Sequence, residues 1–303
     1  MKFWSTLLLA LVPGALAADT FATFNIRYDN SGDAKAGNGW ERRLPVISEI
    51  IHFHAFDVFG TQEGLPHQMK GLREALTEYE VVSYGREDGQ KAGENVAIFY
   101  RKGSYELLEE GRFWLSDTPD QPGKGWDAAL PRICTWAKLR DIKAEREFFF
   151  FNIHFDHRGG EARLESAKLM LKKAAEIAGD SPVVMVGDFN AAQDSEPYRL
   201  LDQSEKVSDA YRLAPIRMAR VGTINKFDPT AATQSRIDHL FVSEEFQVNR
   251  FGILSDSYRS TDEMEVSEGT SDGNFPKEVR FHQSQARLPS DHFPVVAIVE
   301  WAE

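Results

Sequence analysis

Length, composition and charge place this chain among globular proteins and exclude several classes. Its 303 residues are 42% hydrophobic and 12% aromatic, which is enough to build a core and excludes an intrinsically disordered chain. Asp and Glu outnumber Lys and Arg by 47 to 35, a net charge of −12, so we expect neither a basic nucleic-acid-binding module nor a stable nucleic-acid partner. The single cysteine, Cys134, excludes an internal disulfide and any zinc site built from several cysteines.

Residues 1–17 have the pattern of a secretory signal peptide. Lys2 gives a basic start, residues 7–12 are uniformly apolar, and Ala15-Leu16-Ala17 offers small residues for cleavage. The apolar run is shorter than the roughly 20 residues that a membrane-spanning helix needs. We therefore expect a secreted or periplasmic protein without a membrane span; the alternative for this stretch is a buried N-terminal helix.

The remainder, residues 18–303, reads as one domain in which short strands outnumber helices. Runs rich in β-branched and aromatic residues predict strands at Thr20–Ile26, Val58–Thr61, Val96–Tyr100, Ile133–Leu139, Phe148–His154, Val183–Val186, Ile237–Val242 and Pro294–Trp301. Apolar residues at helical spacing predict helices at Glu41–His54, Pro66–Leu76 and Glu161–Ala178. Strands and helices do not alternate regularly, which favours an α+β fold of packed sheets over a doubly wound parallel sheet.

Residues 255–290 are an insertion of different composition, rich in Ser, Asp, Glu, Gly and Gln. Structureless loops longer than about 15 residues are uncommon and are often functional or disordered. Because this segment lies next to Asp291 and His292, it is either a lid over a site or a surface insertion.

Polar residues stand at the ends of several predicted strands. They are Asn25, Glu63, His154, Asp156, Asp188, Asn190, Asp238, Asp291 and His292. Any one of them alone is an ordinary turn residue or cap. Carboxylates, amides and imidazoles are costly to bury without partners, however, so their repeated placement indicates that they converge on one site.

Their chemistry suits phosphate-ester hydrolysis. Carboxylate and amide oxygens such as those of Glu63, Asp291 and Asn25 favour magnesium, manganese or calcium over zinc. His154 and His292 remain for proton transfer or for contact with phosphate. A divalent cation stabilises charge on phosphoryl oxygens while a base activates water. We therefore expect a phosphate-ester substrate and Mg²⁺ as cofactor, with Mn²⁺ as an alternative.

Six motifs occur in a characteristic order over almost the whole chain after residue 17. They are Thr23-Phe24-Asn25-Ile26-Arg27, Gly60-Thr61-Gln62-Glu63, Asn152-Ile153-His154-Phe155-Asp156-His157, Gly187-Asp188-Phe189-Asn190, Arg236-Ile237-Asp238-His239 and Ser290-Asp291-His292. In these motifs the chain resembles the endonuclease/exonuclease/phosphatase (DNase I-like) superfamily of metal-dependent phosphoesterases. The resemblance implies a four-layer α/β-sandwich, in which two packed mixed β-sheets are flanked by helices.

The same resemblance implies roles at the matching positions. Glu63 would be the principal metal ligand, assisted by Asn25 and Asp291. Asp188 would orient or deprotonate the attacking water, and Asn190 would bind a phosphate oxygen.

Two histidines complete the implied catalytic set. His292 would pair with Asp238 as an acid–base or charge-stabilising dyad, and His154 would contact the scissile phosphate. Glu94 falls where nuclease members carry a glutamate that orients the first histidine; the alternative is a solvated turn acid. Which group donates the proton, and whether one or two metal ions bind, stays open.

Candidate substrate-binding residues are Arg27, Arg132 and Asp156. Arg132 enters a predicted strand, and its planar guanidinium is well shaped to clamp a phosphate oxygen. The alternative for Arg132 is a surface salt bridge.

The favoured function is an exported, monomeric phosphoesterase that acts on a small or carbohydrate-linked phosphate mono- or diester. The first alternative is a secreted endonuclease or exonuclease, against which the net charge of −12 argues. The second is a sphingomyelinase-like phosphodiesterase, which would need an apolar membrane-docking hairpin that the sequence does not show. The third is a catalytically inactive binding module, which the complete set of motif residues disfavours.

Overall fold

The computed structural model describes residues 18–260 and 284–303. The predicted signal peptide, residues 1–17, lies outside the described residues, as does the middle of the 255–290 insertion. Within the described ranges, no helix is both long and apolar enough to cross a membrane.

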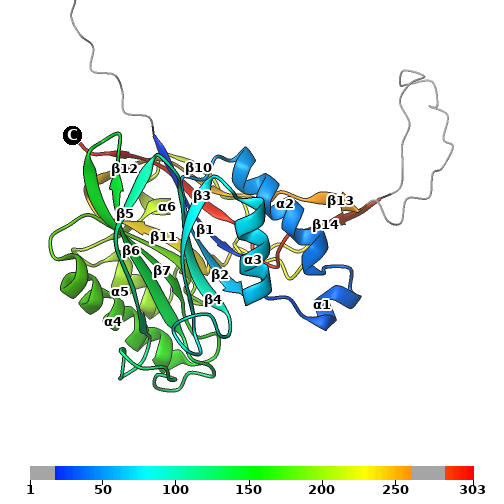
Figure 1. Cartoon of the computed structure of the whole chain (residues 1–303), viewed down its shortest axis with the longest axis horizontal. Helices are drawn as coiled ribbons and strands as arrows, with labels where there is room; N and C mark the ends of the chain where they lie inside the picture. Colours follow the sequence, from blue (N-terminus) through cyan, green and yellow to red (C-terminus); the bar gives the residue numbers. More distant parts are fainter. Residues whose placement is uncertain (1–17, 261–283) are drawn as a thin grey trace, which may run out of the picture.

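Two mixed β-sheets form the centre of the molecule (Figure 1). In the described part of the chain, the first sheet has seven strands in the order β10 (Ile216–Met218), β12 (Phe246–Ile253), β15 (Val295–Trp301), β1 (Asp19–Asn25), β2 (Val58–Gly64), β4 (Asn95–Arg101) and β3 (Tyr79–Gly85). The second has six described strands in the order β5 (Tyr105–Trp114), β6 (Ile133–Asp141), β7 (Arg146–His154), β8 (Val183–Asp188), β11 (Asp238–Val242) and β9 (Ser208–Asp209).

Helices cover the outer faces of both sheets (Figure 1). The first sheet packs against α2 (Trp40–Phe53) and α3 (Pro66–Ala75), and the second against α4 (Gly160–Ala178) and α5 (Glu196–Asp202). Two further helices, α1 (Ser31–Lys35) and α6 (Ala210–Leu213), are short. Helix α4 ends where Gly179 adopts a positive φ of 55°, which stops a helix at little steric cost.

Three apolar layers hold these elements together. Between the sheets, Phe21 and Ile98 of one sheet meet Phe148, Phe150 and Leu240 of the other. A second cluster lies between β7 and β8 and helices α4 and α5, and a third lies between β1 and β2 and helices α2 and α3. The predicted four-layer sandwich is therefore confirmed.

Strand direction explains why the candidate residues gather at one edge. β1 and β2 are parallel neighbours, as are β7 and β8, so their carboxyl ends lie together. In the first sheet, β4 runs antiparallel to β2, and β15 runs antiparallel to β1. In the second sheet, β6 runs antiparallel to β7, and β11 runs antiparallel to β8. These four strands therefore begin at the edge where β1, β2, β7 and β8 end. The polar residues at all eight strand ends therefore face a common region.

Each predicted strand and helix is present, with its ends shifted by a few residues. The prediction missed β3, β5 and β12 and the short elements. Strands β3 and β5 are edge strands, and only three of the ten residues of β5 are buried, so the apolar signal is weak. The flanks of the 255–290 insertion also pair, as β13 (Tyr258–Ser260) and β14 (Gln285–Arg287).

Candidate active site

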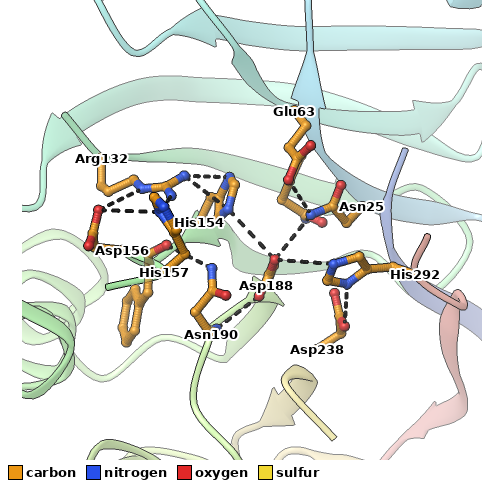
Figure 2. A network of polar contacts seen from close by, with 12 residues as sticks. Asn25, Glu63, Arg132, His154, Asp156, His157, Asp188, Asn190, Asp238 and His292 are labelled. Atoms are coloured by element: carbon orange, nitrogen blue, oxygen red, sulfur yellow. Dashed lines mark hydrogen bonds and ion pairs between the residues drawn. The ribbon is translucent and has the colours of Figure 1, made fainter. Parts of the chain in front are cut away.

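Asp188, at the end of β8, is the centre of a polar network (Figure 2). Its Oδ2 atom lies 3.0 Å from Asn25 Nδ2, 3.6 Å from His154 Nε2 and 3.9 Å from His292 Nε2. Its Oδ1 atom accepts a 2.8 Å hydrogen bond from the backbone N–H of Asn190. Burial and the nearby charge of Asp238 raise the pKa of Asp188 to about 7. One carboxylate thus joins residues from both sheets.

Gly187 allows this network to form. β-Pairing places Asp188 opposite both His154 of β7 and Asp238 of β11. A Cβ atom on Gly187 would lie 2.0 Å from the carbonyl oxygen of Ile153, too close for any side chain. The glycine before Asp188 is therefore required by the close approach of β7 and β8.

The predicted pairing of His292 with Asp238 is present. His292 Nδ1 lies 2.9 Å from Asp238 Oδ2, and both residues are buried. Burial alone would lower the pKa of His292, but the charge and hydrogen bond of Asp238, with Asp188 nearby, raise it well above its ordinary value. Because Nδ1 faces a carboxylate, it carries a proton, and a cationic ring also presents an Nε2–H toward Asp188.

Thr223 holds this dyad in place. Its hydroxyl oxygen accepts hydrogen bonds from the backbone N–H groups of Ile237, at 3.0 Å, and Asp238, at 3.1 Å. Its carbonyl accepts another from the N–H of Phe293 at 2.7 Å. A single buried threonine therefore fixes the backbone on both sides of the dyad.

His154 has the opposite electrostatic setting. Burial, followed by the adjacent Arg132 guanidinium, holds the pKa of His154 well below its ordinary value. Arg132 Nη1 lies 3.0 Å from Nδ1 and 2.9 Å from Nε2 of this ring. Arg132 is only 4% exposed, so it is not the surface salt bridge considered as an alternative. The two histidines on either side of Asp188 thus differ in charge, with His154 neutral and His292 cationic.

Asp156 does not occupy the substrate-binding position predicted for it. Its Oδ1 accepts hydrogen bonds from the backbone N–H groups of Arg158, at 2.9 Å, and Gly159, at 2.8 Å. Its Oδ2 accepts from the N–H of Leu130 at 3.3 Å and lies 3.5 Å from Arg132 Nε. Burial would raise the pKa of Asp156, but these backbone hydrogen bonds hold it well below its usual range. Its oxygens are occupied, and the prediction is corrected: Asp156 positions Arg132.

Glu63 and Asn25 are in direct contact. Asn25 Nδ2 donates to Glu63 Oε1 at 3.0 Å, while Asn25 Oδ1 accepts from the N–H of Arg27 at 3.0 Å. Glu63 Oε2 accepts from the N–H of Tyr28 at 3.0 Å, and Glu63 has a positive φ of 68°. Asn25 therefore turns its amide nitrogen toward the carboxylates of Glu63 and Asp188, and its predicted metal-ligand role stays a prediction.

Asp291 and Arg27 complete this acidic side of the site. Arg27 Nη1 lies 3.4 Å from Asp291 Oδ2, and Arg27 Nε lies 2.8 Å from Asp33 Oδ2. Burial raises the pKa of Asp291, and the nearby charge of Glu63 also raises it. Arg27 is thus already engaged by two carboxylates and is positioned to fix Asp291; its predicted substrate contact stays a prediction.

The contact expected between Glu94 and His154 does not form. Glu94 Oε2 pairs with Arg86 Nη1 at 2.6 Å, whereas His154 lies against Arg132 and Asp188. Burial raises the pKa of Glu94, as does the nearby charge of Glu63. Glu94 is therefore neither the histidine-orienting group nor a solvated turn acid, but half of an ion pair beside the site.

Asn190 lies beside Asp188, to which its backbone N–H donates, and its predicted phosphate contact stays a prediction. It adopts a positive φ of 47°, and its Nδ2 donates to the carbonyl oxygen of Phe155 at 3.1 Å. The second hydrogen of this amide nitrogen remains available for a ligand.

Two supporting groups, Arg43 and Gln62, were given no role from the sequence. Arg43, fully buried, donates to the carbonyl oxygens of Ile26 (2.5 Å), Asn38 (2.8 Å), Arg27 (3.1 Å) and Pro289 (3.1 Å). Gln62 of β2 donates to Asn152 Oδ1 of β7 at 2.7 Å, which links the two sheets beneath the site. Their only sequence signal is a polar residue at an apolar strand or helix position.

The acidic groups fit a divalent cation. Ligand atoms of Glu63, His154 and Asp188 all lie within 4.8 Å of one another, and so do those of Asp188, Asp238 and His292. Burial and a neighbouring carboxylate each raise the pKa of Asp188 and of Asp291. A cation between these groups would relieve their mutual repulsion, and carboxylate oxygens are the ligands that Mg²⁺ and Ca²⁺ prefer.

Comparison with known proteins agrees with this geometry. The model of the Endonuclease/Exonuclease/phosphatase family matches residues 22–292. A crystal structure of a member of that family from Bacteroides thetaiotaomicron is 43% identical, covers 95% of this chain and 99% of its own, and superposes with a TM-score of 0.86. The mannosyl-6-phosphatase of Bacteroides thetaiotaomicron is also 43% identical, with coverages of 93% and 100% and a TM-score of 0.85. A relative from Bacteroides vulgatus is 34% identical, with coverages of 95% and 100% and a TM-score of 0.80. The chain belongs to the endonuclease/exonuclease/phosphatase family, whose members are hydrolases of phosphate esters, and has its DNase I-like fold.

Proposed function

We propose that this protein is an exported, divalent-metal-dependent phosphoesterase that hydrolyses a phosphate ester of a small or carbohydrate-linked alcohol. The observation that carries the proposal is the division of charge around Asp188: carboxylates for a cation lie on one side, and Arg132 with its two histidines lies on the other (Figure 2). Phosphate esters need both, because their oxygens are anionic and the transition state gains charge on them.

Mg²⁺ is the proposed cation, with Mn²⁺ as the alternative. Glu63 and Asp291 would hold it, because both are carboxylates of the acidic side, and burial and the charge of Glu63 raise the pKa of Asp291 in spite of its contact with Arg27. When bound, the ion supplies Lewis-acid stabilisation of charge on the phosphoryl oxygens.

The chain's own residues account for the other requirements of the reaction R–O–PO₃²⁻ + H₂O → R–OH + HPO₄²⁻. Asp188 is central enough to orient the attacking water and accept its proton. His292, kept cationic by Asp238, would donate a hydrogen bond or a proton toward the phosphoryl group. His154 and Asn190 would contact phosphate oxygens without adding charge.

The substrate class rests on two observations. The mannosyl-6-phosphatase of Bacteroides thetaiotaomicron is 43% identical over nearly the full length. The net charge of −12 opposes strong binding of a polyanion such as DNA or RNA. A sugar phosphate is therefore favoured over a nucleic acid.

A substrate panel with Mg²⁺ tests this proposal. It contains mannose 6-phosphate, p-nitrophenyl phosphate, bis-p-nitrophenyl phosphate, plasmid DNA, RNA and sphingomyelin. We expect the highest kcat/KM for a sugar phosphate. Faster cleavage of DNA or RNA would show a nuclease, faster cleavage of sphingomyelin would show a lipid phosphodiesterase, and no turnover of any substrate by folded protein would show a binding module.

A further inference from the structure

His157 lies beside the site in contact with Arg132, and the proposed reaction gives it no role. Its Nδ1 atom lies 3.0 Å from Arg132 Nη2, and its side chain is 41% exposed. In Figure 2, His154, His157 and Asn190 all lie on the side of Asp188 away from Glu63 and His292. Arg132 contacts His154 through Nη1 and His157 through Nη2, so a ligand that reaches His154 and this guanidinium comes close to the ring of His157.

Arg132 fixes the tautomer of His157. A guanidinium has only N–H donors, so the ring nitrogen that faces it at 3.0 Å must be an acceptor. The one carboxylate oxygen near that nitrogen, Asp156 Oδ2, is 3.9 Å away, too far for Nδ1 to donate to it instead. The proton therefore lies on Nε2, at the part of the ring that is directed away from Arg132.

Arg132 also retains a donor for a ligand. A guanidinium carries five N–H groups. Contacts with Asp156 and His157 engage one hydrogen each on Nε and Nη2, and Nη1 lies against both ring nitrogens of His154, so among the described residues one hydrogen remains on Nη2. Arg132 thus supplies a positive charge, and His157, in contact with it, supplies an N–H donor at Nε2.

We propose, building on the proposed phosphoesterase function, that Arg132 and His157 form a subsite for a terminal phosphate oxygen and thereby select phosphate monoesters over diesters. A monoester dianion has three terminal oxygens, whereas a diester has two and carries an alkoxy group in place of the third. At this subsite the third oxygen accepts from the Nε2–H of His157 and from Arg132. An alkoxy group there leaves the buried guanidinium of Arg132 without an anionic partner, which is costly, and removes the charge-assisted hydrogen bond of the half-exposed His157 Nε2–H.

Two substrates with the same leaving group measure this selectivity. They are p-nitrophenyl phosphate, a monoester, and methyl p-nitrophenyl phosphate, which differs from it by one methyl group. His157→Asn keeps an acceptor near the position of Nδ1 but loses the Nε2–H, whereas His157→Gln places an amide N–H near the position of Nε2. We expect His157→Asn to lower kcat/KM for the monoester ten- to a hundredfold and that for the diester by less than twofold. His157→Gln should recover a substantial part of the monoester activity.

His52 supplies a matched control. It is a histidine of α2 whose side chain is 43% exposed and paired with Glu78, and it lies on a different element from the site. His52→Asn should change neither kcat/KM, and the thermal midpoints of all three variants should match that of the wild type.

The results separate this inference from the function on which it rests. Wild-type protein that hydrolyses neither substrate with Mg²⁺ would contradict the proposed phosphoesterase function. Wild-type activity with equal losses on both substrates in His157→Asn, or no loss on either, would overturn the subsite alone. Equal monoester activity of His157→Asn and His157→Gln would also overturn it. Hydrolysis of the monoester would then not depend on a hydrogen bond from an N–H at the position of His157 Nε2.

Discussion

Replacing Asp238 with Asn removes the charge that sustains the His292 cation while changing little of the shape. Asp238 Oδ2 lies 2.9 Å from His292 Nδ1, and the backbone N–H of Asp238 is held by Thr223, a contact that the substitution keeps. Among the described residues, Asp238 Oδ1 is buried without a hydrogen-bond partner, so an Asn side chain loses nothing there.

The magnitude follows from the charge separation. Two unit charges about 4 Å apart attract by about 4 kcal/mol at an effective dielectric constant of about 20. Loss of that attraction in the transition state corresponds to a fall in rate of about 10³-fold, because each 1.36 kcal/mol is tenfold. Asp188 and Asp291 still stabilise the imidazolium, so we expect kcat/KM to fall by about 10²- to 10³-fold.

Steady-state kinetics with p-nitrophenyl phosphate and saturating Mg²⁺ measures this loss. Asp238→Asn also removes one partner of a buried ion pair, so the thermal midpoint is measured alongside and the kinetics are compared at a temperature where both proteins are folded. Asp194→Asn, at an exposed aspartate, is the control and should retain activity within twofold. Wild-type kcat/KM in Asp238→Asn would refute the role assigned to the dyad.

Three further predictions concern stability, each read from chemical denaturation. Burial raises the pKa of Asp19 from 3.8 to about 6, so the folded chain binds more protons there than the unfolded chain between these values. Asp19 should therefore lower the free energy of unfolding by about 1–2 kcal/mol as pH rises from 4 to 6, after allowance for its partial exposure. Other buried carboxyls contribute to the slope in the same direction, so Asp19→Asn should reduce the slope by this amount, and an unchanged slope would contradict the assignment. Arg43→Met leaves the buried carbonyl groups of Ile26, Asn38 and Pro289 without the hydrogen bond from Arg43 and should cost at least about 3 kcal/mol; a loss below about 1 kcal/mol would show that these bonds contribute little. Gly187→Ala forces a Cβ atom against the carbonyl oxygen of Ile153 and should cost about 3 kcal/mol, whereas neutral behaviour would show that the strands can separate there.

The sequence predicts the central part of the site because strand ends carry its chemistry. Asn25, Glu63, His154 and Asp188 follow apolar runs that become parallel neighbours in the two sheets, so their convergence follows from topology. Asp238 joins them because β11 runs antiparallel to β8. The pattern of apolar runs with polar ends is local, and it was sufficient to predict that these residues converge on one site.

Contacts between distant segments could not be predicted in this way. Arg43 joins α2 to the carbonyl oxygen of Pro289 across 246 positions, and no local pattern marks that contact. The roles expected of Glu94 and Asp156 were wrong because their partners, Arg86 and a set of backbone amides, depend on loop conformation. Positive φ at Glu63 is likewise set by its tertiary surroundings, since no intrinsic preference of glutamate favours it.

Metal dependence of turnover tests the central claim most directly. The protein is stripped with EDTA, dialysed, and assayed with mannose 6-phosphate while Mg²⁺ or Mn²⁺ is added back, in parallel with Glu63→Gln. The account predicts no turnover without metal, saturable recovery with Mg²⁺, and no recovery to wild-type rate at the same Mg²⁺ concentration in Glu63→Gln. Full turnover by the stripped wild-type protein in the presence of EDTA would contradict it.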